Sequence, residues 1–182
     1  MRIRDTKGFT LIELLIVVAI IGIIAAIAVP GLLSARRAGN EASAIGSLRA
    51  ITSSQQAFAS TCANGFYAAD LTDLAQLPVG GGAPFISPDL GAAASVDKSG
   101  YTVTLSAAGD GAAGSATAPD ACNAIPASAL SSSWYATAFP MTPGSTGTRF
   151  FWVGTLGTIY ADLSDTFGTD GMVAAAGGNP IQ

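Results

Sequence analysis

Histidine is absent from this sequence of 182 residues, and cysteine occurs only twice, as Cys62 and Cys122. Without histidine, the chain lacks the side chain that most often serves as a general base or binds a metal. Charged residues make up only 11% of the chain, and no serine or threonine is paired with an evident base. These absences argue against an enzyme. If the chain is not a structural protein, the alternative is a binding or enzyme domain that is anchored to the membrane and lies in the periplasm.

Basic residues are few as well, with eight against twelve acidic ones and a net charge of -4. Three of the eight, Arg2, Arg4 and Lys7, lie within the first eight positions. Removing residues 1–8 discards these three and one acid, Asp5, so the remainder has a net charge of -6. Binding to nucleic acid depends on basic groups that neutralise phosphates. The charge therefore gives no direct evidence for a nucleic-acid partner, and a local basic patch on an assembled filament is the alternative.

Charge is missing altogether from Leu14 to Val29, an apolar run that directly follows Glu13. Such a segment can cross a bilayer, which takes about 20 apolar residues at 1.5 Å each. A carboxylate at the membrane centre costs about 2.5 to 3.5 kcal/mol. Cleavage between Gly8 and Phe9 would create an α-amine one helical turn away, and opposite charges about 4 Å apart gain about 4 kcal/mol at an effective dielectric near 20. The pattern predicts that Glu13 has such a partner.

The segment Gly8 to Val18, GFTLIELLIVV, resembles the prepilin cleavage and methylation signature of type IV pilins and of type II secretion pseudopilins. The resemblance implies that a prepilin peptidase cuts after Gly8 and methylates the new terminus at Phe9. It implies that Glu13 pairs with the amine of a neighbouring subunit during assembly. The partners it implies are further copies of the chain, the peptidase, an inner-membrane assembly platform and a cytoplasmic ATPase. The expected function is structural, as a filament subunit.

Three alternatives accompany this interpretation. A pseudopilin of a periplasmic pseudopilus shares the signature, although the chain lacks the Trp-Gly-Asn-Pro-Tyr-like stretch that major pseudopilins often carry. A plain membrane anchor leaves Glu13 without a role. A signal peptide cut after Ala26-Ile27-Ala28 would discard that acid. Motility, adhesion and DNA uptake all stay open as uses of the filament.

The basic leader predicts the orientation in the membrane. Basic residues favour the cytoplasmic side, so the body of the chain lies outside the cytoplasm, first on a single-pass inner-membrane precursor and later on a cell-surface pilus. That compartment permits disulfides. We therefore expect a bridge between Cys62 and Cys122, which would close a loop of about 60 residues and stabilise the fold by about 4 kcal/mol on the loop-entropy account.

The expected fold class is α+β, with a long N-terminal helix packed on a small antiparallel sheet. Its parts are a cleaved leader (1–8), a membrane and assembly helix (9–30), an amphipathic continuation (31–60) and an extracytoplasmic β-sheet domain with a flexible tail (61–182). Pro30 should kink the helix or loosen its preceding turn, and the family melts the corresponding stretch, Gly22 to Pro30, in filaments. An ordinary helix end at Pro30 is the alternative.

The continuation shows apolar residues at three- and four-residue spacings, which indicates one face packed on the domain. These are Ala38, Ala42, Ile45, Leu48, Ile51 and Phe58, with Arg36, Arg37, Asn40, Glu41, Arg49 and Gln56 mostly off that face. Residues 61–100 are expected to form a loop with a short helical turn capped by Asp70. Alternation predicts strands at 101–105, 134–139, 149–153 and 158–161, the last two joined by a hairpin at 154–157.

Oxygen-bearing side chains gather after the last predicted strand, at Asp162, Ser164, Asp165, Thr169 and Asp170. We expect no cofactor and no metal, and the solvated acidic loop is the favoured interpretation. Calcium bound by Asp162, Asp165 and Asp170 is the alternative, because calcium takes six to eight oxygen ligands.

Overall fold

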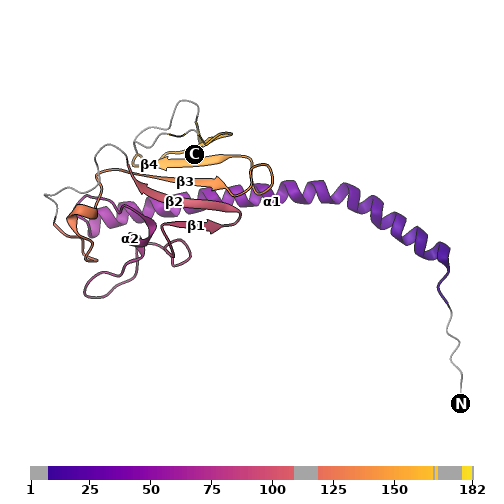
Figure 1. The fold of residues 1–182 in the computed structure, drawn as a ribbon, viewed down its shortest axis with the longest axis horizontal. Coiled ribbons are helices and arrows are strands. Elements are labelled where there is room, and N and C mark those ends of the chain that lie inside the picture. The colour runs from indigo at the N-terminus through magenta and orange to yellow at the C-terminus, as the bar shows by residue number, and fades with distance from the viewer. Residues whose placement is uncertain (1–7, 109–118, 166, 168–177, 182) are drawn as a thin grey trace, which may run out of the picture. The chain divides into compact units, whose positions relative to one another are not determined.

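A computed structural model describes residues 8–108, 119–165, 167 and 178–181, and the chain divides into two compact units, Met1–Arg36 and Arg37–Gln182. The helices are α1 (Leu11–Thr61) and α2 (Leu71–Ala75), with a 3-10 turn at Ala127–Ala129. The strands are β1 (Ser95–Lys98), β2 (Tyr101–Ala107), β3 (Trp134–Pro140), β4 (Phe150–Gly154), β5 (Ile159–Asp162) and β6 (Asn179–Ile181). Figure 1 shows the strands alongside the C-terminal half of α1. The predicted α+β class is confirmed.

The first unit consists of the apolar part of α1, whose large side chains are exposed from Phe9 to Leu33. This helix is long and apolar enough to cross a membrane. It stays helical through Gly22 and Pro30, so the alternative of a helix end at Pro30 is wrong and the preceding turn is not loosened in the single chain, while a kink at Pro30 stays a prediction. Pro30 removes only the one hydrogen bond that its missing N–H would donate, and the turns on both sides stay helical. Melting of 22–30 in a filament stays a prediction.

The six strands form one antiparallel sheet in the order β1-β2-β3-β4-β5-β6, so every strand pairs with its neighbours in sequence. Tyr101, Val103 and Leu105 of β2 are buried as the alternation predicted. Two edge strands were missed. β1 pairs with β2 through the turn at Ser99 and Gly100, whose φ angles of 51° and 75° suit a two-residue hairpin. β6 lies in the segment predicted to be a flexible tail and pairs with β5.

The core lies between the inner face of the sheet and α1 from Glu41 onward. The largest fully buried side chains include Trp134, Tyr101, Phe58 and Phe151. The helix face was predicted only in part, because its buried positions are Glu41, Ala44, Ser47, Leu48, Ile51, Ser54, Gln55, Phe58 and Ala59. Ala38 and Ala42, placed on the buried face by the sequence, are exposed, whereas Glu41, placed off it, is buried. Leu48, Ile51 and Phe58 are buried as predicted, and the observed face departs from the predicted one at its N-terminal end, where Glu41 and Ala44 replace Ala38 and Ala42.

The disulfide between Cys62 and Cys122 is present, as the sequence predicted, and the two positions are 60 apart in the sequence. It fastens the segment after residue 119 to the end of α1. Backbone hydrogen bonds strengthen this junction, with the Cys122 N–H donating to the Cys62 carbonyl at 3.0 Å and the Val79 N–H to the Cys122 carbonyl at 2.7 Å. The described segment 119–133 is thus tied to the end of α1, and it also buries Ala121, Ile125 and Leu130 in the core.

Residues 61–94 form a loop with one short helix, as predicted, whereas the end of the predicted loop, Ser95–Lys98, is strand β1. Asp70 caps α2 by accepting hydrogen bonds from the N–H groups of Thr72 and Asp73, and the Asp73 carboxylate bonds back to the cap. Burial and the nearby Asp70 charge raise the pKa of Asp73 above its ordinary value.

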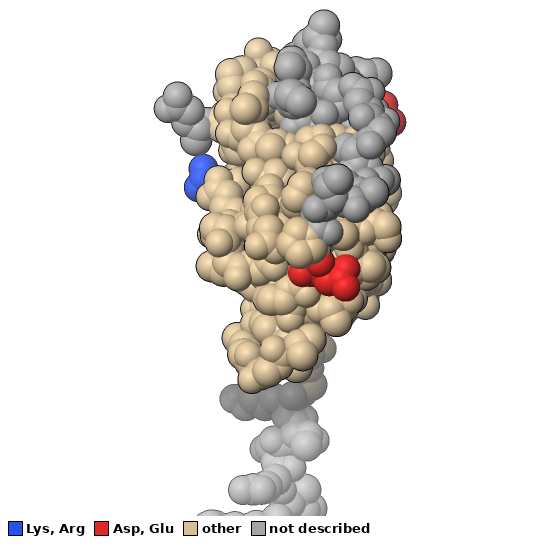
Figure 2. All heavy atoms as spheres, turned by 90° about the vertical axis from the view of Figure 1, so that its left-hand side faces the viewer, with Lys and Arg blue, Asp and Glu red and all other residues tan. Residues whose placement is uncertain are grey.

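The face of the second unit seen in Figure 2 is largely uncharged, with isolated basic and acidic side chains. Among the described residues drawn on that face, the basic side chains form no patch.

Candidate functional site

The N-terminal site begins where the chain enters α1. Gly8 and Phe9 precede the helix in exposed, non-helical backbone, and the Phe9 side chain is 77% exposed. A peptidase needs an accessible, unwound peptide bond, and the bond between these residues meets that requirement. The leader residues Met1 to Lys7 lie outside the described residues.

Thr10 and Glu13 form a capping box at the start of α1. The Glu13 Oε2 atom accepts hydrogen bonds from the Thr10 N–H at 2.9 Å and from the Thr10 hydroxyl at 2.6 Å. In return, the Glu13 N–H donates to the Thr10 Oγ1 at 3.3 Å. Such reciprocal bonds satisfy N–H groups that the first helical turn leaves without partners. Glu13 therefore already has a local partner in the uncut chain.

Sequence reasoning had assigned Glu13 to a partner created by cleavage and had passed over Thr10. The signal was available, since a threonine followed three residues later by glutamate, before an apolar run, is the sequence pattern of a capping box. In the structure one carboxylate oxygen of Glu13 serves the cap. The other is assigned no hydrogen bond within the described part of the chain, so one oxygen is left for a further donor.

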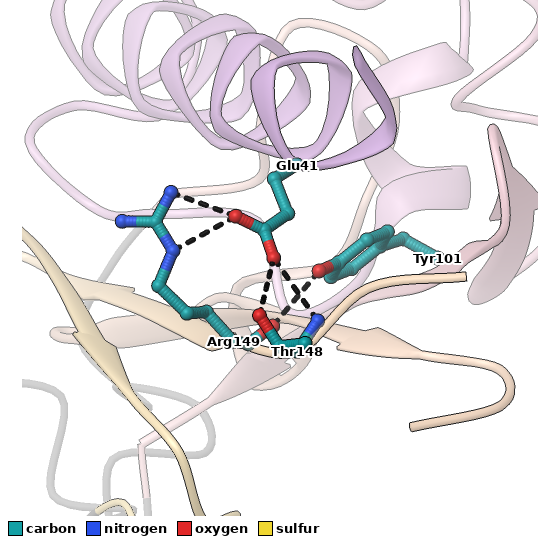
Figure 3. A network of polar contacts seen from close by, with 4 residues as sticks. All are labelled: Glu41, Tyr101, Thr148 and Arg149. Carbon is teal, nitrogen blue, oxygen red and sulfur yellow. Dashed lines mark hydrogen bonds and ion pairs between the residues drawn. The ribbon is translucent and has the colours of Figure 1, made fainter. Parts of the chain in front are cut away.

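A second polar site joins α1 to the loop 142–149, and Figure 3 shows its four side chains. Glu41 Oε1 accepts hydrogen bonds from the N–H and the hydroxyl of Thr148, both at 3.0 Å. Glu41 Oε2 lies 2.8 Å from both Nε and Nη2 of Arg149. The hydroxyl of the buried Tyr101 donates to the Arg149 carbonyl at 2.9 Å. We call this group the Glu41 network.

Two further α1 side chains hold the same loop. Asn40 Nδ2 donates to the Thr146 carbonyl at 2.8 Å, and Arg37 Nη1 donates to the Gly144 carbonyl at 3.1 Å. Residues 37, 40 and 41 are three and four positions apart, so they share one side of the helix. That side binds the loop through backbone oxygens and one carboxylate rather than through apolar contacts.

Glu41 is charged in the native protein. Burial alone would raise its pKa, but the hydrogen bonds from Thr148 and Arg149 outweigh burial and hold the pKa of Glu41 below its ordinary value. Burial and the Glu41 charge raise the pKa of the Tyr101 hydroxyl, which keeps it a hydrogen-bond donor. The buried carboxylate of Glu41 thus accepts hydrogen bonds from the N–H and the hydroxyl of Thr148 and pairs with the guanidinium of Arg149.

The calcium candidates are placed as follows. Asp162 ends β5, and its Oδ1 accepts hydrogen bonds from the N–H groups of Leu163 and Ser164. Asp165 follows in the same turn, while Asp170 lies outside the described residues. Among the residues that the structure describes, no three acidic, histidine or cysteine side chains are grouped to hold a metal. Calcium binding at this turn stays a prediction.

Comparison with known proteins bears on the N-terminal site. Residues 3–29 match the family described as "Prokaryotic N-terminal methylation motif". The type IV wide pilus major component PilA4 of Thermus thermophilus is 63% identical over 38 residues, which are 21% of this chain and 29% of the relative. The type IV major pilin protein PilA of Myxococcus xanthus is 48% identical over 52 residues, which are 29% of this chain and 24% of the relative. No solved structure matches the chain.

The family match covers the segment that carries Gly8, Phe9 and Glu13, and the chain spans about a quarter of the length of the curated relatives it matches. The chain is thus similar to type IV pilins over a short segment, and its long apolar N-terminal helix and small antiparallel sheet are consistent with that likeness. Its relatives are named as structural components of pili rather than as enzymes.

Proposed function

We propose that this protein is a structural subunit of a type IV pilus-like filament, cleaved between Gly8 and Phe9 and polymerised through the N-terminal part of α1. The observation that carries the proposal is one carboxylate, Glu13, directly before the uncharged apolar run from Leu14 to Val29 and four residues after the exposed Gly8-Phe9 bond. The motif match over residues 3–29 and the pilin relatives support it. Prepilin peptidase is the proposed processing enzyme and the source of the methyl group on Phe9.

Localisation follows from the same helix. We place the precursor in the inner membrane, with its leader in the cytoplasm and the sheet domain outside, and the assembled subunit on the cell surface. The Cys62 to Cys122 disulfide supports an extracytoplasmic domain, since structural disulfides persist in oxidising compartments. Uncut protein should stay in the membrane, because Arg2, Arg4 and Lys7 would have to cross the hydrocarbon with it.

During assembly, the N-terminal part of α1 would leave the lipid and pack against the α1 helices of other subunits. Because lipid is already apolar, moving apolar surface out of it contributes little free energy to assembly. The favourable free energy must therefore come from helix packing and polar pairing. Ala19, Gly22, Ala25 and Ala26 are small residues that let helices approach closely. The new amine of Phe9 would pair with Glu13 of a neighbouring subunit. We assign the external energy to an assembly platform and a cytoplasmic ATPase.

The capping box gives Glu13 a second task in this scheme. Oε2 already accepts two hydrogen bonds from Thr10, which fixes the carboxylate at the helix start before any neighbour arrives. A positioned acceptor loses less side-chain freedom on pairing than a free one. The Phe9 amine of a second subunit would therefore meet a carboxylate that is already oriented.

The first test is the intact mass and N-terminal peptide of the protein recovered from its cells. A terminus at Phe9 with one added methyl group is the expected result. A terminus at Val29 would instead identify a secreted domain released by signal peptidase, and an intact Met1 would identify a plain anchor. Either of these two outcomes would overturn the proposal.

The second test is Glu13→Ala in cells that lack the wild-type chain. Membrane insertion should persist, because the apolar run is unchanged, whereas surface filaments should be lost. Glu13→Gln is the matched control, since it keeps an oxygen for Thr10 and removes only the charge; it should fail to assemble as well. Normal filament yield from either variant would remove the proposed role of the Glu13 charge. Filaments confined to the periplasm would favour a pseudopilus.

A further inference from the structure

The face of the sheet turned away from α1 has an unusual composition. Side chains at alternate positions on β2 to β5 form this outer face, and they are hydroxyl-bearing or aromatic almost throughout. Asp162 is the one charged side chain among the residues of these four strands that point outward, all of which the structure describes. Solvated sheet faces ordinarily carry charged residues. A face of hydroxyls and rings instead suits a ligand that offers both hydrogen bonds and apolar surface.

The strand register gathers these side chains into rows. Thr104 of β2, Thr137 of β3 and Trp152 of β4 are successive cross-strand partners. The adjoining row places Ser106 beside Tyr135, and Tyr135 beside Gly154, which has no side chain. Side chains of cross-strand partners lie close together on one face of a sheet, so the hydroxyls of these two rows are neighbours.

A groove of about 330 Å³ lies on this outer face. Its lining includes the hydroxyls of Ser106, Tyr135 and Thr137, the rings of Phe139 and Trp152, and the side chains of Asp165 and Phe167 from the turn after β5. The rings of Phe139 and Phe167 are stacked, with centroids 6.3 Å apart. The volume lies at the lower end of the range for small-molecule pockets, about 300 to 1,000 Å³. We call this the sheet groove.

The polar groups of the sheet groove are largely unused. Within the described part of the chain, no hydrogen bond is assigned to the side chains of Ser106, Tyr135, Thr137 or Asp165, whereas Thr104 shares one with Ser95. The indole nitrogen of Trp152 is buried and has no acceptor among the described residues. Buried donors ordinarily have partners, and those without one often mark a site that a ligand or water completes.

From this arrangement we infer that the sheet groove binds a neutral saccharide. A pyranose ring offers hydroxyl groups, each both donor and acceptor, around faces of C–H bonds. The hydroxyls of Ser106, Tyr135 and Thr137 match the first, and the rings match the second. Asp165 would accept hydrogen bonds from sugar hydroxyls, and a sugar oxygen would give the Trp152 N–H an acceptor. This inference is independent of filament assembly.

The charge of the groove lining excludes some classes of ligand. Asp165 lies in the groove without a lysine or arginine among its described lining residues, so sialic and uronic acids would be repelled. An organic cation could be attracted by Asp165 and by the rings. A quaternary ammonium group, however, has no hydrogen-bonding atoms and would leave three hydroxyls of the groove desolvated without partners. A neutral saccharide can pack its C–H faces on the rings and give hydrogen-bond partners to the hydroxyls.

The experiment is saturation-transfer NMR on the full chain in a detergent that lacks a sugar head group. The probes are methyl β-glucopyranoside, methyl β-galactopyranoside and N-acetylglucosamine, with N-acetylneuraminic acid and tetramethylammonium as charged counterparts. Transfer to at least one neutral sugar and none to N-acetylneuraminic acid is expected. Absence of transfer to every neutral sugar would overturn the inference, and transfer to tetramethylammonium alone would make the groove a cation site.

Two matched hydroxyl deletions locate the binding. Tyr135→Phe removes one hydroxyl inside the groove, and Tyr160→Phe removes one from the same sheet face, beside Trp152 but outside the groove lining. Tyr135→Phe should weaken binding about 2- to 10-fold, the usual effect of one hydrogen bond, and Tyr160→Phe should change it less than twofold. Thr137→Val, of equal shape, is the second groove variant. Equal effects of groove and control variants would refute binding at this place.

Discussion

Oε2 of Glu41 lies 2.8 Å from both Nε and Nη2 of Arg149, a residue 108 positions further along the chain. Glu41 is on α1, and Arg149 directly precedes β4. The pair is asymmetric, because the Glu41 side chain is 9% exposed and that of Arg149 is 41% exposed. The guanidinium carbon also lies 5.3 Å from the centre of the Phe151 ring. One buried carboxylate thus connects the helix, the loop 142–149 and the sheet.

Replacing Glu41 by glutamine should lower the free energy of unfolding by about 1 to 3 kcal/mol. The amide has one acceptor oxygen where the carboxylate has two, and Arg149 loses its counter-charge. The cost stays below that of a fully buried pair because water reaches the guanidinium. Urea unfolding followed by tryptophan fluorescence measures it. Asp89→Asn is the control, since its pair with Lys98 is exposed and should contribute less than about 1 kcal/mol; equal losses in both variants would contradict the burial argument.

Acid should remove the contribution of Glu41. Its pKa in the folded protein lies below the ordinary value of 4.5, so the unfolded chain binds the proton more readily than the folded one. The stabilisation is therefore fully present above the unfolded pKa and is lost as the pH falls through the folded pKa. The difference in melting temperature between wild type and Glu41→Gln should be constant from pH 7 to about 5 and shrink below about 4.5. A difference that grows on acidification would reverse the sign and refute the assignment.

The approach of Gly147 to Tyr101 provides another test. A Cβ atom added at Gly147 would overlap the ring and hydroxyl of Tyr101, which is fully buried and cannot move aside. Gly147→Ala should therefore destabilise the domain by about 1 to 3 kcal/mol through overpacking. Gly46→Ala is the matched control, because a Cβ there meets nothing within 4 Å on a helical residue. That variant should stabilise by about 0.5 to 1 kcal/mol, and a loss of stability in it would indicate a constraint outside the single chain.

Features that depend on residues close together in the sequence were predicted correctly. The alternation of Tyr101, Val103 and Leu105 correctly gave the buried face of β2, and Asp70 correctly gave the cap of α2. The two cysteines lie where the sequence suggested a bridge, and the structure forms it. In each case a short-range rule, such as period, capping chemistry or compartment, was sufficient.

Features set by distant residues escaped prediction. Glu41 looked like a solvated helix residue, because nothing near it in sequence indicates that Thr148 and Arg149 will supply donors. Only the spacing of Ala44, Leu48 and Ile51, extended back by one turn, places position 41 on the buried face. β6, with three residues including Pro180, is too short to show a period, and its pairing with β5 decides its conformation.

Removing the disulfide should destabilise the sheet domain without unfolding α1. The Cys62→Ser, Cys122→Ser double variant loses a link across 60 residues, worth about 2 to 4 kcal/mol. Urea unfolding of this variant and of reduced wild type should give the same midpoint, below that of the oxidised protein. A midpoint equal to that of oxidised wild type would mean that the hydrogen bonds between Cys122, Cys62 and Val79 already hold this junction.

Thr10 offers a separate test of how Glu13 is prepared for assembly. Thr10→Val keeps the shape of the side chain and the N–H bond to Glu13 but removes the hydroxyl that lies 2.6 Å from Oε2. The carboxylate then has one donor fewer and a wider choice of rotamers, so pairing with an incoming amine should lose about 0.5 to 1.5 kcal/mol per subunit. Sheared filaments quantified by immunoblot should fall several-fold, with the N-terminal mass of the subunit unchanged. Thr10→Ser retains the hydroxyl and should assemble nearly as wild type. If the valine variant assembled as well as the serine variant, the capping box would serve the helix alone, and Glu13 would need no positioning before its neighbour arrives.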